Sequence, residues 1–238
     1  MTKILLLWRN YGMNHPKELS GSSLKTLAAI CMFIDHLDYL VLRGFPQTVF
    51  FENFCRGIGR ISFPVFCFLL TEGFVYTSNR TRYAIRLFVF ALLSEFPYDL
   101  AFSETFSLLH SQNVFFTLLI GLLVLWGMEW FSKNIFLQAF VLLIGMGISI
   151  LFGCDYSWQG VLLIAVLFFF RQDSFSMTAA GISVCLLWSW AAAFAFLPIR
   201  LYNKQRGWMN GPAAKYAFYL FYPLHLLLLV WIRKVLFS

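Results

Sequence analysis

"LKTLAAICMFIDHLDYLVLRG", residues 24 to 44, has the length of a membrane-crossing helix but carries Asp35, His36 and Asp38 in its middle. A bilayer core needs about 20 mainly apolar residues to cross. Each ionisable side chain at bilayer depth costs about 2.5 to 3.5 kcal/mol on insertion scales. We therefore expect these residues to have a chemical role that offsets their cost.

The composition predicts an integral membrane protein. The chain has 238 residues, of which 60% are hydrophobic and only 12% charged, far from the balance of a soluble domain. The early apolar run at residues 4–8 is too short for a signal peptide or a span. The helix at 24 to 44 is thus expected to act as its own insertion signal, and one domain over residues 1–238 is predicted.

Neither the charge nor the cysteines indicate nucleic acid or a metal. The net charge is +7, but Lys and Arg are scattered through short loops and do not gather on one face. The five cysteines lack metal-ligand spacing, and most lie inside apolar runs. We predict that they stay reduced, with no nucleic-acid partner and no metal.

Apolar runs predict an all-α, polytopic transmembrane helix bundle with about eight spans. The runs lie at 24–44, 58–77, 82–102, 113–131, 134–152, 156–171, 175–199 and 212–236. Gly and Pro separate several of them. A segment at 43–57 or 156–171 that enters the membrane and returns is an alternative.

The distribution of Lys and Arg predicts a cytoplasmic N-terminus. The cytoplasmic side then holds Lys3, Arg9, Lys17, Lys25, Arg80, Arg82, Arg86, Lys133, Arg171, Arg233 and Lys234. The opposite side holds Arg43, Arg56, Arg60, Arg200, Lys204, Arg206 and Lys215. The basic segment "RLYNKQRG" at 200 to 207 conflicts with this rule, so either it lines a polar site on the outer face or one span is miscounted.

Lys25 and His36 share one face of the first predicted span. They are eleven residues apart, or about 16 Å along a helix. Lys25 can contact a phosphate at the cytoplasmic end, while His36 can exchange a proton near neutral pH. The alternative is a structural histidine bonded to a neighbouring helix, with Asp35 paired to an arginine. Asp35 points about 100° away, so a carboxylate that orients His36 must come from another helix.

Other ionisable residues lie within or at the ends of apolar runs: Glu72, Glu95, Asp99 and Arg60. Such residues usually face a bundle interior or a water-filled cavity. Glu72 or Glu95 is a candidate to hold the His36 tautomer. Arg60 is a candidate either to neutralise an acid or to stabilise an oxyanion.

The last predicted span contains Tyr222 and His225 in "KYAFYLFYPLHLLLL". Both are too deep for interface anchors, and their depth matches that of His36. Pro223 cannot donate a backbone hydrogen bond, which predicts a kink beside them. A polar pocket shared with His36 is therefore expected.

The stretch "RTRYAIRLF" places Arg80, Arg82 and Arg86 at the cytoplasmic start of the third span. One interpretation is an ordinary positive-inside loop. The other is a phosphate clamp for a cytosolic nucleotide thioester, because guanidinium groups bind phosphate through two hydrogen bonds.

Six segments resemble the TraX family, named for the membrane protein that acetylates the N-terminus of F-type conjugative pilin. They are "ELSGSSLKTLAAICMFIDH", "GRISFPVFCFLLTEGF", "YAIRLFVFALLSEFPYDL", "NVFFTLLIGLL", "YNKQRG" and "KYAFYLFYPLHLLLL", in the family's order over nearly the whole chain. The resemblance implies acetyl-CoA as donor, a bacterial inner membrane and His36 as catalytic base, and it adds Asn203 and Lys204 as substrate-binding candidates. The family is similar to acyltransferases that acetylate surface glycans, where an Arg stands at the position of Lys25.

These observations predict a transmembrane acetyltransferase that moves an acetyl group from acetyl-CoA to an amine or hydroxyl of an envelope protein or glycan. The catalytic candidates are His36, Asp35, Glu72 and Glu95; the substrate-binding candidates are Lys25, Arg60, Arg80, Arg82, Arg86, Asn203, Lys204, Tyr222 and His225. Two alternatives need no coenzyme. One is a proton-coupled transporter or lipid flippase that uses the buried charges as a relay, and the other is a non-enzymatic adaptor for pilus or envelope assembly.

Overall fold

The computed structural model describes residues 18–46, 48–103, 111–209 and 211–237, and this part of the chain is all-α. Its helices are α2 (Gly21–Leu40), η1 (Leu42–Gly44), α3 (Val49–Tyr76), α4 (Arg80–Phe102), α5 (Val114–Trp130), α6 (Ile135–Leu151), α7 (Ser157–Phe169), α8 (Ser174–Cys185), η2 (Trp190–Ala195), α9 (Phe196–Arg200) and α10 (Pro212–Phe237). Lys3, Arg9, Lys17 and the apolar run at 4–8 lie outside the described residues. The all-α prediction is confirmed.

Polar side chains set where several helices begin. Ser20 accepts a hydrogen bond from the Ser23 amide at the start of α2, and Thr48, Asn79 and Asn113 cap α3, α4 and α5 in the same way. Such caps satisfy backbone amides that have no partner within the helix. The cap at Thr48 lets α3 begin nine residues before the predicted span, which started at residue 58.

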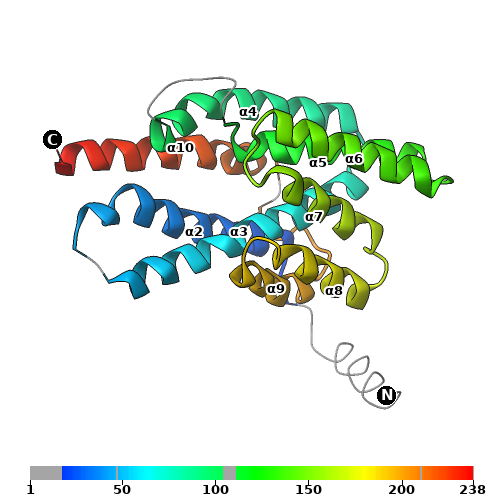
Figure 1. Cartoon of the computed structure of the whole chain (residues 1–238), viewed down its shortest axis with the longest axis horizontal. Coiled ribbons are helices and arrows are strands. Elements are labelled where there is room, and N and C mark those ends of the chain that lie inside the picture. Colours follow the sequence, from blue (N-terminus) through cyan, green and yellow to red (C-terminus); the bar gives the residue numbers. More distant parts are fainter. Residues whose placement is uncertain (1–17, 47, 104–110, 210, 238) are drawn as a thin grey trace, which may run out of the picture.

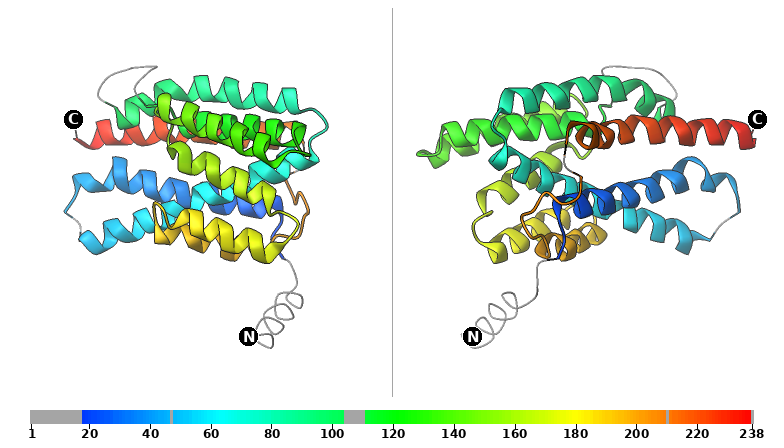
Figure 2. Two further views of the ribbon diagram at one scale, coloured as in Figure 1. Left: turned by 45° about the vertical axis from the view of Figure 1, so that its right-hand side comes forward. Right: turned by 180° about the vertical axis from the view of Figure 1, so that it is seen from behind.

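The helices pack as two layers with α7 between them (Figure 1). One layer contains α4, α5, α6 and α10, and the other contains α2, α3 and the α8–α9 segment, as both views in Figure 2 also show. α7 packs against α3 and against α5. We call the end of the bundle where α2 begins the near end, and the end where α2 finishes the far end.

Two described helices, α3 and α10, are long and apolar enough to cross a membrane. α2 and α4 have comparable lengths but carry several charged residues, while α5, α6, α7 and α8 are shorter apolar helices. The number of spans therefore stays a prediction.

The predicted single span at 175–199 is wrong. This segment is a hairpin: α8 ends at Cys185, and η2 and α9 turn back along it, so that Phe196 packs against Gly181. The hairpin packs against α3 near Gly57, whose Cβ, if present, would lie 3.8 Å from the Ala191 Cβ. The alternative that 43–57 or 156–171 enters the membrane and returns stays a prediction.

The hairpin moves the basic loop after α9 to the near end. The Leu19 amide donates to Leu201 O at 3.0 Å, and the Gly21 and Ser22 amides donate to Gln205 O and Arg206 O. The predicted separation of Arg200, Lys204, Arg206 and Lys215 from Lys25 is therefore wrong. So is the placement of Arg233 and Lys234 on the side of Lys25, because α10 ends at the far end, where Phe237 packs on Phe45.

This correction concentrates positive charge at the near end. Of the described basic residues, the near end has Lys25, Arg80, Arg82, Arg86, Lys133, Arg171, Arg200, Lys204, Arg206 and Lys215; the far end has Arg43, Arg56, Arg60, Arg233 and Lys234. The two ends of the bundle thus differ in charge more than the sequence indicated.

Candidate active site

A cavity of about 880 Å³ runs between the two layers. Its lining follows α2 from Gly21 to Tyr39, about 27 Å of helix axis at 1.5 Å per residue. Along α3 the lining extends from Arg56 to Tyr76. The cavity therefore reaches from the near end to the far end, and its volume lies in the range of small-molecule sites.

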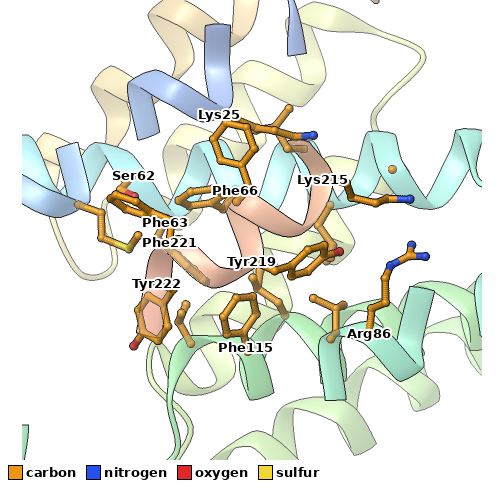
Figure 3. Close-up of a pocket in the computed structure, with 18 of the residues that line it drawn as sticks. Lys25, Ser62, Phe63, Phe66, Arg86, Phe115, Lys215, Tyr219, Phe221 and Tyr222 are labelled. Atoms are coloured by element: carbon orange, nitrogen blue, oxygen red, sulfur yellow. The ribbon is translucent and has the colours of Figure 1, made fainter. Parts of the chain in front are cut away.

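Five basic side chains line the near part of the cavity, and we call them the near-end cluster: Lys25, Arg82, Arg86, Arg206 and Lys215. Figure 3 shows Lys25, Lys215 and Arg86 pointing toward the same side of the pocket. The Arg86 Nε is buried and has no hydrogen-bond partner among the described residues. A buried donor without a partner is costly, and an anionic ligand would satisfy it.

Aromatic side chains line the middle of the cavity. Phe66, Phe115, Tyr219 and Phe221 lie between the near-end cluster and Tyr222 (Figure 3). The Tyr219 hydroxyl interacts with the Arg86 guanidinium, which links this aromatic section to the near-end cluster. A long, partly apolar arm attached to an anionic head group fits this sequence of surfaces.

His36 is bonded to a second histidine on α10. Its Nδ1 lies 2.7 Å from His225 Nε2, and the two rings are nearly parallel, at 3°. His225 Nδ1 lies 2.8 Å from Phe221 O. His36 lines the cavity, whereas His225 is only 4% exposed and stands behind it.

This chain of hydrogen bonds fixes the tautomer of both neutral rings. A carbonyl oxygen can only accept, so His225 Nδ1 carries a proton and donates it to Phe221 O. His225 Nε2 then accepts from His36 Nδ1. His36 Nε2 is left with a free lone pair, and none of the described residues forms a recorded hydrogen bond to it. The predicted orienting carboxylate is therefore replaced by His225.

The far part of the cavity carries both charges, and we call its residues the far-end cluster: Asp35, Arg56, Arg60, Tyr98, Asp155 and Tyr156. Asp35 packs so closely on α3 that a Cβ on Gly59 would lie 2.3 Å from the Asp35 Cβ. Only glycine permits this approach. Arg60 forms a hydrogen bond with the Tyr156 hydroxyl.

Asp155 lies in the loop between α6 and α7 and is held there by neighbouring backbone. Its amide donates to Gln112 O at 2.8 Å, and its carbonyl accepts from the Thr117 hydroxyl. Tyr156 and Ser157 follow with φ of 60° and 42°, values that are strained for residues other than glycine. Burial raises the pKa of the Asp155 carboxyl to about 6, an increase that Arg60 and the Tyr156 amide limit.

Asp155 shares the cavity lining with three tyrosines. Tyr98, Tyr156 and Tyr222 each interact electrostatically with it. Tyr222 also contacts His36 edge to face, with ring centroids 6.4 Å apart. The far-end cluster is therefore continuous with the His36 ring.

Several predicted site residues lie away from His36. Arg80 pairs with Glu129 and does not line this cavity. Glu95 accepts hydrogen bonds from the Asn113 amide and side chain, so it supports the start of α5. Glu72 lines the near part of the cavity, about 20 Å along α3 from Gly59 and Asp35.

Asn203 and Lys204 shape the loop after α9 and do not line the cavity. Asn203 Oδ1 accepts from the Gln205 amide, and Lys204 has a φ of 62°. In contrast, the structure brings Lys25, Arg82, Arg86, Asp35, His36, Arg60 and Tyr222 to one cavity, with His225 directly behind His36.

Sequence reasoning missed six site residues: Arg56, Arg206, Lys215, Tyr98, Asp155 and Tyr156. Asp155 had one signal, because it is the sole acidic residue between Glu129 and Asp173. Arg206 and Lys215 were assigned to the wrong end. Within the described ranges, no group of three or more His, Cys, Asp or Glu residues is placed to hold a metal ion.

Comparison with known proteins gives two matches to this chain. The sequence model of a family described as "TraX protein" matches residues 20–233. A probable fimbrial assembly protein FimC, serogroup H1, of Dichelobacter nodosus is 28% identical over 244 residues, which cover 91% of this chain and 97% of the relative. No solved structure matches the chain.

Proposed function

This chain belongs to the TraX family, and from that premise we propose that it is a membrane-embedded acetyltransferase that uses acetyl-CoA. The acceptor is an amine or hydroxyl of an envelope protein or glycan, in keeping with the fimbrial-assembly name of the Dichelobacter relative. One observation carries the proposal: a single cavity joins five basic side chains to an imidazole with a free Nε2.

The near-end cluster is the proposed site for the phosphates of acetyl-CoA. Arg82 and Arg86 supply planar guanidinium donors. Lys25 on α2, Lys215 on α10 and Arg206 in the loop before α10 add positive charge. The aromatic section then covers the pantetheine arm. This arrangement directs the thioester toward His36, about 16 Å along α2 from Lys25.

His36 is the proposed general base. Its Nε2 takes the proton of the acceptor as the acceptor's nitrogen or oxygen bonds to the acetyl carbon and the carbon–sulfur bond breaks. The departing thiolate then receives that proton. General-base catalysis contributes about 10² to 10⁴ in rate. Transient acetylation of the imidazole is an alternative route.

Tyr222 and Arg60 are the proposed donors to the developing oxyanion. Both line the cavity, and Tyr222 is in edge contact with the His36 ring. His225, a predicted substrate-binding residue, already bonds to His36 and Phe221 O. We assign it to positioning instead.

We further propose a multi-pass protein of a bacterial inner membrane whose near end is cytoplasmic. The excess of basic residues at that end follows the positive-inside rule. Acetyl-CoA is cytosolic, so the near-end cluster would face its source. The acceptor would reach His36 from the far end or from within the bilayer.

The test uses membranes that contain the full chain, supplied with acetyl-labelled acetyl-CoA. His36→Ala and His36→Gln should lower transfer to envelope acceptors by about 10²-fold or more. Lys133→Gln, an exposed substitution between α5 and α6, is the matched control and should transfer at the parental rate. Undiminished transfer by both His36 variants would remove this residue from the mechanism.

A proton-coupled transporter is the second candidate, because ionisable residues line the cavity from one end to the other. Such a protein has no need of the coenzyme. A thermal shift of the purified protein on addition of coenzyme A favours the transferase. Proton-coupled solute movement in vesicles without such a shift favours the transporter.

A further inference from the structure

We propose that the far-end cluster, together with Tyr222, is a binding site for a zwitterion that carries a primary ammonium close to a phosphate or carboxylate. The ammonium would sit at Asp155 and its tyrosines, and the anionic group at Arg56 and Arg60. Identifying this ligand as the acceptor rests on the proposed function. Its binding does not.

The ammonium subsite follows from the surroundings of Asp155. Its carboxylate accepts a hydrogen bond from the Tyr156 amide at 3.0 Å and interacts electrostatically with Tyr98, Tyr156 and Tyr222, all of which line the cavity. A carboxylate in a cavity lined by tyrosines favours a cation through its charge. The left-handed backbone at Tyr156 keeps this residue beside Asp155 at a cost in strain.

The anion subsite follows from two guanidinium groups without direct ion pairs. Arg56 and Arg60 are four residues apart on α3, so they share a helix face, and both line the cavity. Across the described part of the chain, neither has a carboxylate oxygen within 4.0 Å. Guanidinium groups that are not paired with a carboxylate can bind phosphate or carboxylate through two hydrogen bonds.

The charges of the far-end cluster favour a zwitterion over a simple anion or a simple cation. Asp35 and Asp155 offset Arg56 and Arg60, so the far-end cluster is neutral while presenting both signs. A simple anion would meet the two carboxylates, and a simple cation would meet the two guanidinium groups. A ligand with both charges can pair with each.

Tyr222 connects the far-end cluster to His36, the proposed general base. Tyr222 makes an edge-to-face contact with the His36 ring and interacts electrostatically with Asp155. An ammonium held at Asp155 would therefore occupy the same cavity as His36, which would first remove a proton from it to give the nucleophilic amine. The near-end cluster, at the opposite end of the cavity, would remain available to the donor.

Calorimetric titration of the purified full chain in detergent tests the proposal. Phosphoethanolamine is the probe, with ethanolamine and inorganic phosphate as its two halves. We expect phosphoethanolamine to bind at least 10-fold more tightly than either half. Equal affinity for phosphoethanolamine and one half, or no saturable binding at all, would overturn the proposal.

Variants then assign the two subsites. Arg60→Gln and Arg56→Gln should each weaken phosphoethanolamine at least 10-fold with little effect on ethanolamine, and Asp155→Asn should weaken both. Lys133→Gln should change none of these affinities. If Asp155→Asn does not fold, as judged by gel filtration and coenzyme A binding, the two arginine variants decide the matter. Unchanged phosphoethanolamine affinity in both would refute the site.

The source of the zwitterion is resolved by separate arms. Glycine represents an amino acid, and nanodiscs of phosphatidylethanolamine, compared with phosphatidylglycerol, represent a lipid head group. Coenzyme A binding and labelled acetyl transfer are measured on the same preparations. Zwitterion binding without acetyl transfer would support this site and refute the proposed function. Acetyl transfer without zwitterion binding would support the proposed function and refute this site.

Discussion

The two ends of the cavity differ in how their charges are arranged. The near end carries five basic side chains with Glu72 as its acid, and the buried Arg86 Nε lacks a partner within the described residues. The far end carries two basic and two acidic side chains among tyrosines. An excess of one sign suits a polyanion, while a balanced cluster suits a ligand of both signs. If the proposed function holds, the donor and the acceptor would therefore bind at opposite ends, with His36 between them.

The largest effect is expected from a change at His225, which positions His36 between the two ends. His225→Phe removes the acceptor of the His36 Nδ1–H, so His36 no longer holds one tautomer. Acetyl transfer should fall by about 10²-fold, measured as label incorporation at saturating acetyl-CoA. His225→Gln, whose amide oxygen can accept the same proton, should retain more activity than His225→Phe. Equal activity of the phenylalanine variant and the parent would refute the positioning role of His225.

The effect expected next concerns the near end alone. Arg86→Gln and Arg82→Gln should each weaken coenzyme A binding by about 10-fold, because a hydrogen bond to a charged group contributes about 1.5 to 3 kcal/mol. Arg80→Gln is the matched control, since Arg80 pairs with Glu129 outside the cavity. Thermal shift titrations with coenzyme A measure all three. An equal loss in Arg80→Gln would mean that the site is misplaced.

A smaller effect concerns the far end alone. The raised pKa of Asp155, about 6, means that its carboxyl gains a proton as the pH falls through 6 and then no longer attracts an ammonium. Ethanolamine affinity should therefore fall several-fold between pH 7 and pH 5. The other charged or titratable groups that line this part of the cavity are Asp35, Arg60, Tyr98, Tyr156 and Tyr222. Asp155→Asn should flatten this dependence. A parental profile in that variant would assign the titration to another group.

The helix boundaries were largely predictable, because apolar length and polar caps are local properties. The predicted spans at 82–102, 113–131 and 134–152 match α4, α5 and α6 within two residues at each end. The span at 175–199 failed because a hairpin of two short apolar helices has the same composition as one crossing. The backbone pairing of residues 19–22 with 201–206 and the packing of Phe196 against Gly181 distinguish the hairpin from a single crossing.

The site was predictable to the extent that single residues stand out in apolar surroundings. His36, Asp35, Arg60 and Tyr222 do so, and all of them line the cavity. Their partners depend on packing between helices far apart in sequence. His225, not a carboxylate, meets His36, while Glu95 bonds to Asn113. The sequence alone does not specify such pairings, since spacing along one helix says nothing about the register of its neighbour.

The last prediction tests the placement of the two ends and should leave activity unchanged. Cysteine substitutions at Lys204 and Lys133 should react with a membrane-impermeant thiol reagent from one side of the bilayer, and those at Arg43 and Lys234 from the other. The native cysteines Cys31, Cys55, Cys67, Cys154 and Cys185 are buried, which keeps the background low. If Lys204→Cys were labelled from the same side as Lys234→Cys, the α8–α9 segment would cross the bilayer once, and the near-end cluster would be divided between two compartments.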